Sequence, residues 1–215
     1  MIRTLIYLSL GLFALGLFSC NNKEEQKAQG GVIVIGENQR QSEYHGIEFN
    51  KPAYNFCLKT EENNSVKTLC LKDILKNKDV ALVFFGYTHC PDVCPAAMYV
   101  LQEAYQKLGD KKDRVAVVFI SVDPERDTPK VVSEYAKYFN PEFIGLTGTP
   151  EEIKEVSKHY MVYYEKVKQT SETDYLVDHT ANIYLITKDE KIKLIYSPKS
   201  QKPDWIAKDI EKILD

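Results

Sequence analysis

Residues 80–95 read VALVFFGYTHCPDVCP, and this stretch and the segments that follow it decide the fold class. Val80–Gly86 is an unbroken apolar run with the length of a buried strand. Apolar residues recur at helical spacing over Pro95–Leu108, and Gly109 follows where such a helix would end. A second apolar run, Arg114–Val122, has the length of another buried strand. Together these segments predict a βαβ unit at the centre of a sheet.

Further strands and helices are expected on either side of this unit. Two possible strands flank the polar residues 61–65, EENNS, which indicates a β-hairpin. Helices are expected to begin at Thr128-Pro129 and at Thr149-Pro150, where a capping residue precedes a proline. The remaining expected elements are the hairpin strands Tyr54–Leu58 and Lys67–Leu71, the strands Ile183–Thr187 and Lys191–Tyr196, and a last helix at about Pro203–Leu214. This order predicts an α/β, thioredoxin-like fold with an N-terminal β-hairpin and inserted elements.

The composition fits one globular domain behind a short N-terminal segment. The chain has 215 residues, of which 44% are hydrophobic and 27% are charged. Its net charge of −3 lacks the basic excess of a surface that follows phosphates, so nucleic-acid binding is disfavoured. The hydrophobic fraction excludes a wholly disordered chain. The single long apolar run, at the N-terminus, excludes a membrane protein with several spans.

The first 20 residues have the features of an export signal. Arg3 supplies the positive charge, and Leu5–Phe18 is an apolar run too short to cross the bilayer core. Residues 17–20, LFSC, resemble the bacterial lipobox, in which the chain is cut before a cysteine that receives a lipid. We therefore expect a signal peptide at 1–19 and lipidation of Cys20. An ordinary cleaved secretory peptide and an uncleaved short anchor remain alternatives.

The residues after the export signal predict a tether followed by a folded domain. Residues 20–46 are mostly polar, so we expect a lipidated N-terminus and flexible tether in which His45 is solvated. The folded domain is expected to span 47–215. The protein would then be an exported lipoprotein held on a membrane, facing the periplasm or the cell exterior.

Two cysteines in the sequence CPDVCP offer reactive sulfur. Cys90 and Cys94 lie between the first buried strand and its helix, and each directly precedes a proline, so neither is expected to be helical. The amides and dipole of a helix N-terminus lower the pKa of a nearby thiol. This CxxxC spacing is one residue longer than the usual redox motif and tolerates either a disulfide or a bound metal. We expect a reversible pair that can bind metal.

A histidine is the expected third ligand, because two sulfurs leave a borderline-soft metal under-coordinated. His45, His89 and His159 have ordinary explanations as tether, loop and helix residues. His179 directly precedes a predicted sheet strand, so its loop can reach the end of the sheet that carries the cysteines. From the residues alone, a ligand role and an ordinary loop role for His179 both remain open.

Three segments carry a resemblance to a known family. They are FGYTHCPDVCP at residues 85–95, SVDPERDTP at 121–129 and DYLVDHT at 174–180. Each resembles one of the motifs of the Sco/SenC family, and they occur in the correct order across nearly the whole of 47–215. The resemblance implies a thioredoxin-like, membrane-tethered copper protein whose family helps to assemble the binuclear copper centre of cytochrome c oxidase.

The resemblance also implies that Cys90, Cys94 and His179 hold copper. Thiolates favour Cu(I) and an added imidazole supports Cu(II), so such a site can hold either oxidation state. The expected partner is a copper-accepting subunit of cytochrome c oxidase or another exported cuproprotein. Asp178 either affects the orientation or basicity of the neighbouring histidine or is a turn carboxylate.

Two further pairs of residues leave alternatives open. Cys57 and Cys70 lie on opposing arms of the expected hairpin, so they could form a structural disulfide or remain free, buried thiols. Asp92 and Asp123 could steer a partner or simply solvate their loops.

The main competing function is enzymatic. A thiol-disulfide reductase would use Cys90 and Cys94 on exported cysteine proteins without a metal, and His179 would be dispensable or would only modulate thiol pKa. A copper sensor or scavenger would use the same ligands. A peroxidase is less well supported, because the cysteine pattern of peroxiredoxins is absent around Cys90.

Overall fold

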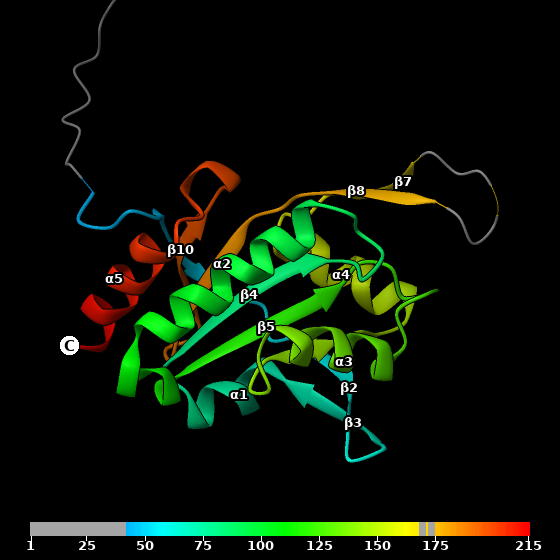
Figure 1. Cartoon of the computed structure of the whole chain (residues 1–215), viewed down its shortest axis with the longest axis horizontal. Coiled ribbons are helices and arrows are strands. Elements are labelled where there is room, and N and C mark those ends of the chain that lie inside the picture. Colours follow the sequence, from blue (N-terminus) through cyan, green and yellow to red (C-terminus); the bar gives the residue numbers. More distant parts are fainter. Residues whose placement is uncertain (1–41, 168–170, 172–174) are drawn as a thin grey trace, which may run out of the picture. The chain divides into compact units, whose positions relative to one another are not determined.

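The fold is built on a six-stranded mixed sheet with the strand order β1-β10-β9-β4-β5-β6 (Figure 1). The computed structural model describes residues 42–167, 171 and 175–215. β4 pairs in parallel with β5 and β5 with β6, whereas the pairs on the other side of β4 are antiparallel. The strands are β1 (Ile47–Pro52), β4 (Val80–Gly86), β5 (Val115–Ser121), β6 (Ile144–Leu146), β9 (Ile183–Thr187) and β10 (Lys191–Tyr196).

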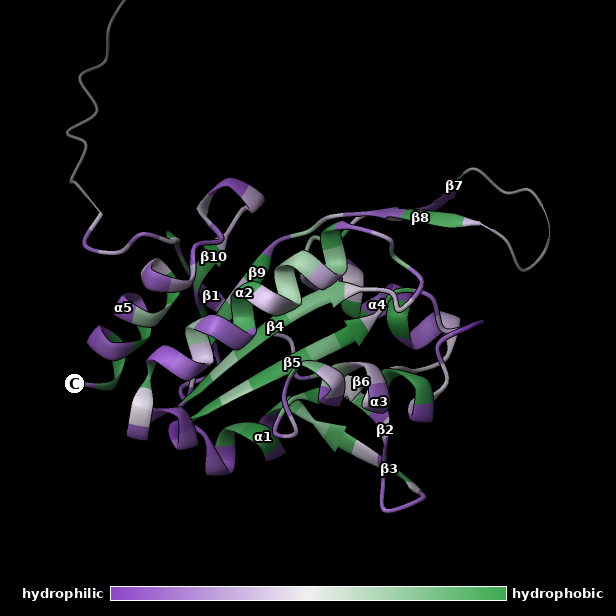
Figure 2. Ribbon diagram, viewed as in Figure 1, coloured by the Kyte–Doolittle hydropathy of each residue, from purple (hydrophilic) through white to green (hydrophobic). Residues whose placement is uncertain are grey.

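The predicted βαβ unit is confirmed and forms the centre of this sheet. β4 and β5 are buried along their whole length, and Figure 2 shows both as mostly hydrophobic. α2 (Val93–Lys107) connects the two strands and lies in front of them in Figure 1. The helix ends before Gly109, whose φ of +54° suits a glycine at a helix end.

The other predicted helices are also confirmed, together with their N-terminal caps. α3 (Pro129–Phe139) begins after Thr128, whose hydroxyl accepts the backbone N–H of Val131. α4 (Pro150–His159) begins after Thr149, which forms a reciprocal capping box with Glu152. α5 (Pro203–Leu214) follows the β9–β10 hairpin. The elements that we did not predict include β1, α1 (Leu71–Asn77), β6 and the short 3₁₀ helices η1 (Gly109–Arg114) and η2 (Pro198–Ser200). The result is the predicted α/β, thioredoxin-like arrangement.

The N-terminal hairpin exists, with strand bounds shifted from those expected. It consists of β2 (Cys57–Glu62) and β3 (Ser65–Cys70), and Leu71 already belongs to α1. Asn63 and Asn64 form the turn with φ of +51° and +58°, which asparagine tolerates well. Cys57 and Cys70 are directly paired across the strands and form a disulfide, so they are not free thiols.

A second hairpin was not predicted, although it carries one of the expected site residues. β7 (Tyr164–Val167) pairs antiparallel with β8 (Leu176–His179), and Figure 1 shows the pair extending beyond the main sheet. Both strands are short and lack a clear apolar alternation, so the usual sequence pattern of a strand is absent. The pairing places His179 opposite Tyr164.

The last residues of the expected tether contact the domain. The backbone N–H groups of His45 and Gly46 donate to the buried Asp209 of α5, and His45 Nδ1 lies 2.8 Å from the same carboxylate. His45 also stacks on Trp205 at 5.1 Å. His45 is exposed, as expected of a solvated residue, but a buried carboxylate accepts its donors, so it is attached to the domain and is not part of a free tether. The predicted signal peptide, Cys20 and residues 21–41 lie outside the described residues. The helices of the described residues include none with the length and hydrophobicity of a membrane span.

Candidate metal centre

The two sulfurs of the candidate site lie where β4 passes into α2. Cys90 is in the connecting loop, whereas Cys94 lies in the first turn of the helix, so the prediction that it is not helical is wrong. Pro95 is tolerated there because the first N–H groups of a helix have no partner within the helix. The bond from Ala96 N–H to the carbonyl of Asp92 closes this first turn at 3.2 Å.

The two sulfurs have different access to solvent. Cys94 is completely buried, while Cys90 is half-buried and accepts the backbone N–H of Cys94 at 3.4 Å. Gly86, the last residue of β4, makes room for the buried sulfur. A Cβ atom at that position would lie 2.8 Å from Cys94 Sγ and 2.9 Å from the ring of Phe119. The close approach therefore requires a glycine.

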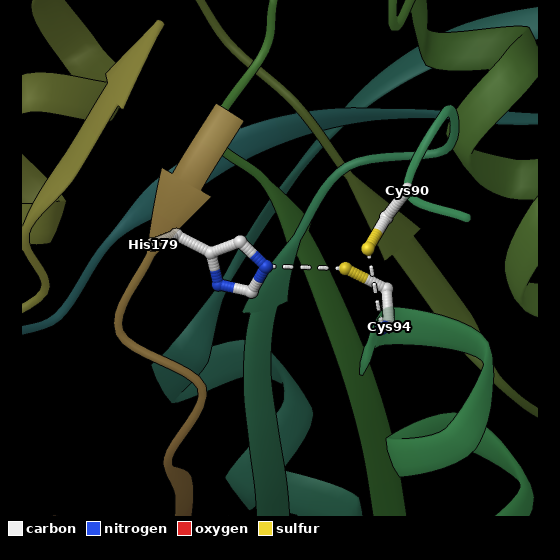
Figure 3. Close-up of side chains that lie close together, drawn as sticks. All are labelled: Cys90, Cys94 and His179. Atoms are coloured by element: carbon white, nitrogen blue, oxygen red, sulfur yellow. Dashed lines mark hydrogen bonds between the residues drawn. The ribbon is translucent and has the colours of Figure 1, made fainter. Parts of the chain in front are cut away.

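His179 approaches the sulfurs from the end of β8. Its Nε2 atom lies 3.2 Å from Cys94 Sγ, and Figure 3 shows the imidazole pointing at the cysteine pair. The other ring nitrogen, Nδ1, lies 3.2 Å from the carbonyl oxygen of Thr180. The rings of Phe84 and Tyr87 meet the imidazole edge-on at about 6 Å, which fixes its plane. His179 therefore lies in a strand and not in the expected loop.

Asp178, the neighbour of His179, lies on the exposed face of β8. Side chains alternate along a strand, so Asp178 points to the face opposite His179, where it is exposed. The Thr180 carbonyl occupies the position at Nδ1 that we expected a carboxylate to influence. The exposed position of Asp178 fits an ordinary surface carboxylate, and an effect on the orientation or basicity of His179 stays a prediction.

The pKa values of the two thiols are shifted in opposite directions. The pKa of Cys90 falls from an ordinary value of 9.0 to about 3, chiefly because Cys94 donates a hydrogen bond to its sulfur, with further help from His179 and backbone amides. The pKa of Cys94 is raised by the same hydrogen bond, by burial and by the negative charge on Cys90. Cys90 thus holds the thiolate while Cys94 keeps its proton.

The three donor atoms fit one soft or borderline metal ion. The sulfurs of Cys90 and Cys94 and a ring nitrogen of His179 all lie within 4.8 Å of one another, the one such cluster in the described part of the chain. Ligand bonds of about 2.0–2.3 Å allow two donors on one ion to stand up to roughly 4.5 Å apart. A small contraction of the site would therefore close it around a metal.

The other histidines do not join this cluster. His89 lies in the loop between β4 and α2, residues 87–92, here called the cysteine loop, and its Nδ1 is 3.1 Å from Thr88 Oγ1. His159 stacks on Tyr54 at 4.0 Å and pairs with Glu155 at 2.9 Å. Both positions agree with the ordinary loop and helix roles expected from the sequence.

The two aspartates with open roles differ in their surroundings. Asp92 is exposed at the start of α2. Asp123 is 2% exposed, so the interpretation as a loop-solvating carboxylate is wrong. It accepts hydrogen bonds from Arg126 Nε and from the hydroxyl of Tyr175, both at 2.6 Å.

Sequence reasoning missed three residues that shape the site. Gly86 could have been found, because a glycine at the end of a buried strand near a cysteine loop suggests a close approach. Thr180 acts through its backbone carbonyl, which no residue type reveals. Asp127 is completely buried and receives donors from the cysteine loop, but those donors come from a segment distant in the sequence.

Comparison with known proteins identifies the family. A model of the SCO1/SenC family matches residues 71–215, which include all three ligand candidates. The chain belongs to the SCO1/SenC family. The chain is 50% identical over 107 residues to the mitochondrial protein SCO1 homolog 1 of Arabidopsis thaliana, covering 49% of this chain and 32% of that protein. It is 40% identical over 132 residues to the mitochondrial SCO1 homolog of Homo sapiens, covering 59% and 42%. These matches therefore span less than half of each relative.

Solved structures of the SCO1/SenC family share this fold. Apo Sco1 from Thermus thermophilus superposes with a TM-score of 0.68 at 37% identity, covering 81% of this chain and 99% of that one. Copper-bound ScoI from Bradyrhizobium japonicum gives a TM-score of 0.64 at 40% identity, with 75% and 99% covered. Copper-bound ScoI from Arabidopsis thaliana gives 0.65 at 37% identity, with 75% and 97% covered.

Proposed function

We propose that this SCO1/SenC protein is a copper-binding metallochaperone that helps to assemble the binuclear copper centre of cytochrome c oxidase. The convergence of Cys90, Cys94 and His179, with Nε2 only 3.2 Å from the buried sulfur, carries the proposal. Two thiolates and one imidazole form a donor set that suits both Cu(I) and Cu(II). The copper-bound structures of two relatives support copper as the metal.

The unequal burial of the ligands suggests how copper leaves the site. Cys90 and His179 are partly exposed, whereas Cys94 is buried behind them. Donor atoms of an acceptor protein would therefore displace Cys90 and His179 first and the Cys94 bond last. A cargo ion needs such a stepwise exchange, because no intermediate then leaves the copper with fewer than two ligands.

We propose further that the domain works at a membrane surface. In this arrangement residues 1–19 are a signal peptide, Cys20 carries a lipid, and a tether leads to the domain at 47–215 on the periplasmic or external side. The expected acceptor is a copper subunit of the oxidase or another exported cuproprotein. Labelling with a radioactive fatty acid, compared between the wild type and Cys20→Ser, tests the anchor. An unlabelled wild-type protein would contradict it.

Copper titration of the reduced chain tests the metal site. We expect one Cu(I) or one Cu(II) per chain, with sulfur-to-copper charge-transfer absorption for Cu(II), and loss of both in Cys90→Ser. The disulfide cysteines supply a matched control, because Cys57→Ser combined with Cys70→Ser removes two other sulfur atoms and leaves the three ligand candidates in place. Stoichiometric binding that survives Cys90→Ser, or no copper bound by the wild type, would contradict the proposal.

The second candidate is a thiol-disulfide reductase, and the unequal thiol pair favours it. The Cys90 thiolate would attack a disulfide of an exported protein and form a mixed disulfide, releasing one partner thiolate. Cys94 would then lose its proton and attack the Cys90 sulfur. This step releases the second partner thiolate and leaves Cys90 and Cys94 oxidised as a disulfide.

His179→Ala separates the two candidates. The change removes the imidazole ligand, so a copper chaperone loses tight Cu(II) binding and copper delivery. A reductase keeps most of its activity, because neither sulfur is removed. Cu(II) affinity and the rate of reduction of a model disulfide, measured on the same variant, distinguish these outcomes.

A further inference from the structure

The loop Asp123–Asp127, between β5 and α3, contacts both halves of the candidate metal site. We propose that this loop, here called the bracket, positions both groups of ligands. One of its carboxylates holds the cysteine loop, and another holds β8, the histidine strand, which ends at His179. The inference rests on the proposed copper function and adds positioning residues to the same site. The loop belongs to the SVDPERDTP segment, to which the proposed function gives no role.

Asp127 holds the cysteine side of the bracket. Its carboxylate is completely buried and accepts three hydrogen bonds, from Thr88 N–H at 3.0 Å, Thr88 Oγ1 at 2.5 Å and Ser121 Oγ at 2.5 Å. Thr88 lies two residues before Cys90, and Ser121 is the last residue of β5. Bonds to a charged acceptor are the strongest kind, so the start of the cysteine loop is fixed against the sheet.

Asp123 and Arg126 hold the histidine side. The Asp123 carboxylate accepts the hydroxyl of Tyr175 and Nε of Arg126, both at 2.6 Å. Arg126 also donates to the carbonyl oxygen of Tyr175 at 3.0 Å, and its guanidinium lies 3.6 Å from the centre of the Tyr175 ring. Tyr175 directly precedes β8, the strand that ends at His179. The ring, hydroxyl and backbone of Tyr175 are therefore all clamped.

One tight turn joins the two sides. The carbonyl of Asp123 accepts the backbone N–H groups of Arg126 at 3.2 Å and Asp127 at 3.0 Å, so both carboxylates are carried by one turn. The backbone N–H of Asp123 in turn donates to Ser121 Oγ, the hydroxyl that bonds Asp127. A single hydrogen-bonded turn thus connects the groups that hold the sulfur side and the imidazole side of the site.

The bracket predicts different copper defects for its two sides. A loosened histidine strand leaves two thiolates, which suffice for Cu(I), but weakens Cu(II), which needs the imidazole. We therefore expect Asp123→Asn and Tyr175→Phe to weaken Cu(II) binding by about 10-fold or more, as is usual for residues that support metal ligands. Cu(I) binding should change by less than about 3-fold. Asp127→Asn should weaken both, because it loosens the cysteine loop.

Glu134→Gln is the matched control. Glu134 lies in the next helix, α3, and loses the same charge, but it is exposed and pairs with Lys130 of the same helix at 3.9 Å. Its copper affinities should stay within about 2-fold of the wild type. Tyr175→Phe removes a single hydroxyl and keeps the ring contact, so it keeps the histidine arm testable if Asp123→Asn fails to fold.

Amide hydrogen exchange of the metal-free chain supplies a readout that does not depend on copper. The bracket predicts faster exchange at residues 175–179 in Tyr175→Phe and at 88–90 in Asp127→Asn, with each variant leaving the other segment unchanged. Unchanged exchange in both segments, or equal loss of Cu(I) and Cu(II) in Tyr175→Phe, would overturn the bracket. A wild type that binds no copper would overturn the proposed function instead, and the exchange result would still decide the bracket.

Discussion

The packing around Gly86 leads to a quantitative prediction. Gly86→Ala adds one methyl group at the end of β4, where the new Cβ atom would lie 2.8 Å from Cys94 Sγ, 2.9 Å from Phe119 Cε2 and 3.1 Å from Phe84 Cε1. Optimal contacts between such atoms are about 3.5–4.0 Å. The neighbours must therefore move by about 0.5–1 Å. The two rings belong to buried sheet strands, so we expect the sulfur to yield.

Overpacking of this size in a buried site costs about 1–3 kcal/mol. We expect the free energy of unfolding to fall by about 2 kcal/mol. If copper binding requires the sulfur to return to its original position, the same strain opposes binding. Because 1.4 kcal/mol is tenfold in an equilibrium constant, copper affinity should fall by about 5-fold to 150-fold.

Urea denaturation and copper titration, carried out on the same variants, measure both effects. Gly109→Ala is the matched control, because a Cβ atom there meets nothing within 4 Å but the φ of +54° strains an alanine. That variant should lose about 1–2 kcal/mol of stability and keep its copper affinity. Gly86→Ala with wild-type stability and wild-type copper affinity would refute the packing argument.

Three further predictions concern the contact of residues 45–46 with α5, the Cys57–Cys70 disulfide and the Cys90 thiolate. Asp209→Ala leaves the buried Tyr196 hydroxyl and the backbone N–H groups of residues 45 and 46 without their acceptor. The free energy of unfolding, measured in urea, should therefore fall by about 2–4 kcal/mol, and amide exchange at 45–46 should become faster. Unchanged exchange would contradict the attachment of these residues to α5. Replacing Cys57 and Cys70 by serine removes a cross-link between positions 13 apart and should lower the free energy of unfolding by about 3 kcal/mol. Copper binding should be retained. Lost copper binding would show that the hairpin supports the site. The lowered pKa of Cys90 makes its thiolate persist down to about pH 3, so alkylation of the reduced protein should hardly slow between pH 8 and pH 5, and a tenfold loss per pH unit would refute it. A depressed pKa contributes stability that is complete above the unfolded value near 9 and is lost as pH falls toward 3, so the stability difference between the reduced wild type and Cys90→Ser should shrink over that window.

The residues that could be read correctly from the sequence act through local rules. The βαβ unit follows from two apolar runs and a helical stripe, and Thr128 and Thr149 mark helix starts because capping involves residues only three positions apart. The role of Asp123 could not be read in this way. Its buried environment comes from Tyr175, which lies 52 residues away in the chain.

The β7–β8 hairpin could not be predicted from the sequence, for a related reason. Its strands are too short and too polar for a periodic pattern, so pairing with each other, and not intrinsic preference, makes them extended. The polar neighbours of His45 predict a solvated tether residue, but they do not reveal its hydrogen-bond partner. Only the fold brings it to Asp209, 164 residues away.

The sequence by itself determined the chemistry available to this protein: two cysteines near the start of a helix, a distant histidine, and the apolar runs of the βαβ core. The tertiary structure decided which of those groups meet. It buries Cys94 and half-exposes Cys90, brings Nε2 of His179 to 3.2 Å from the buried sulfur, and leaves Asp178 exposed on the surface. The physical reason is that hydrophobic periodicity and capping depend on near neighbours, whereas ligand distances, thiol pKa and buried hydrogen bonds depend on segments that only packing brings together.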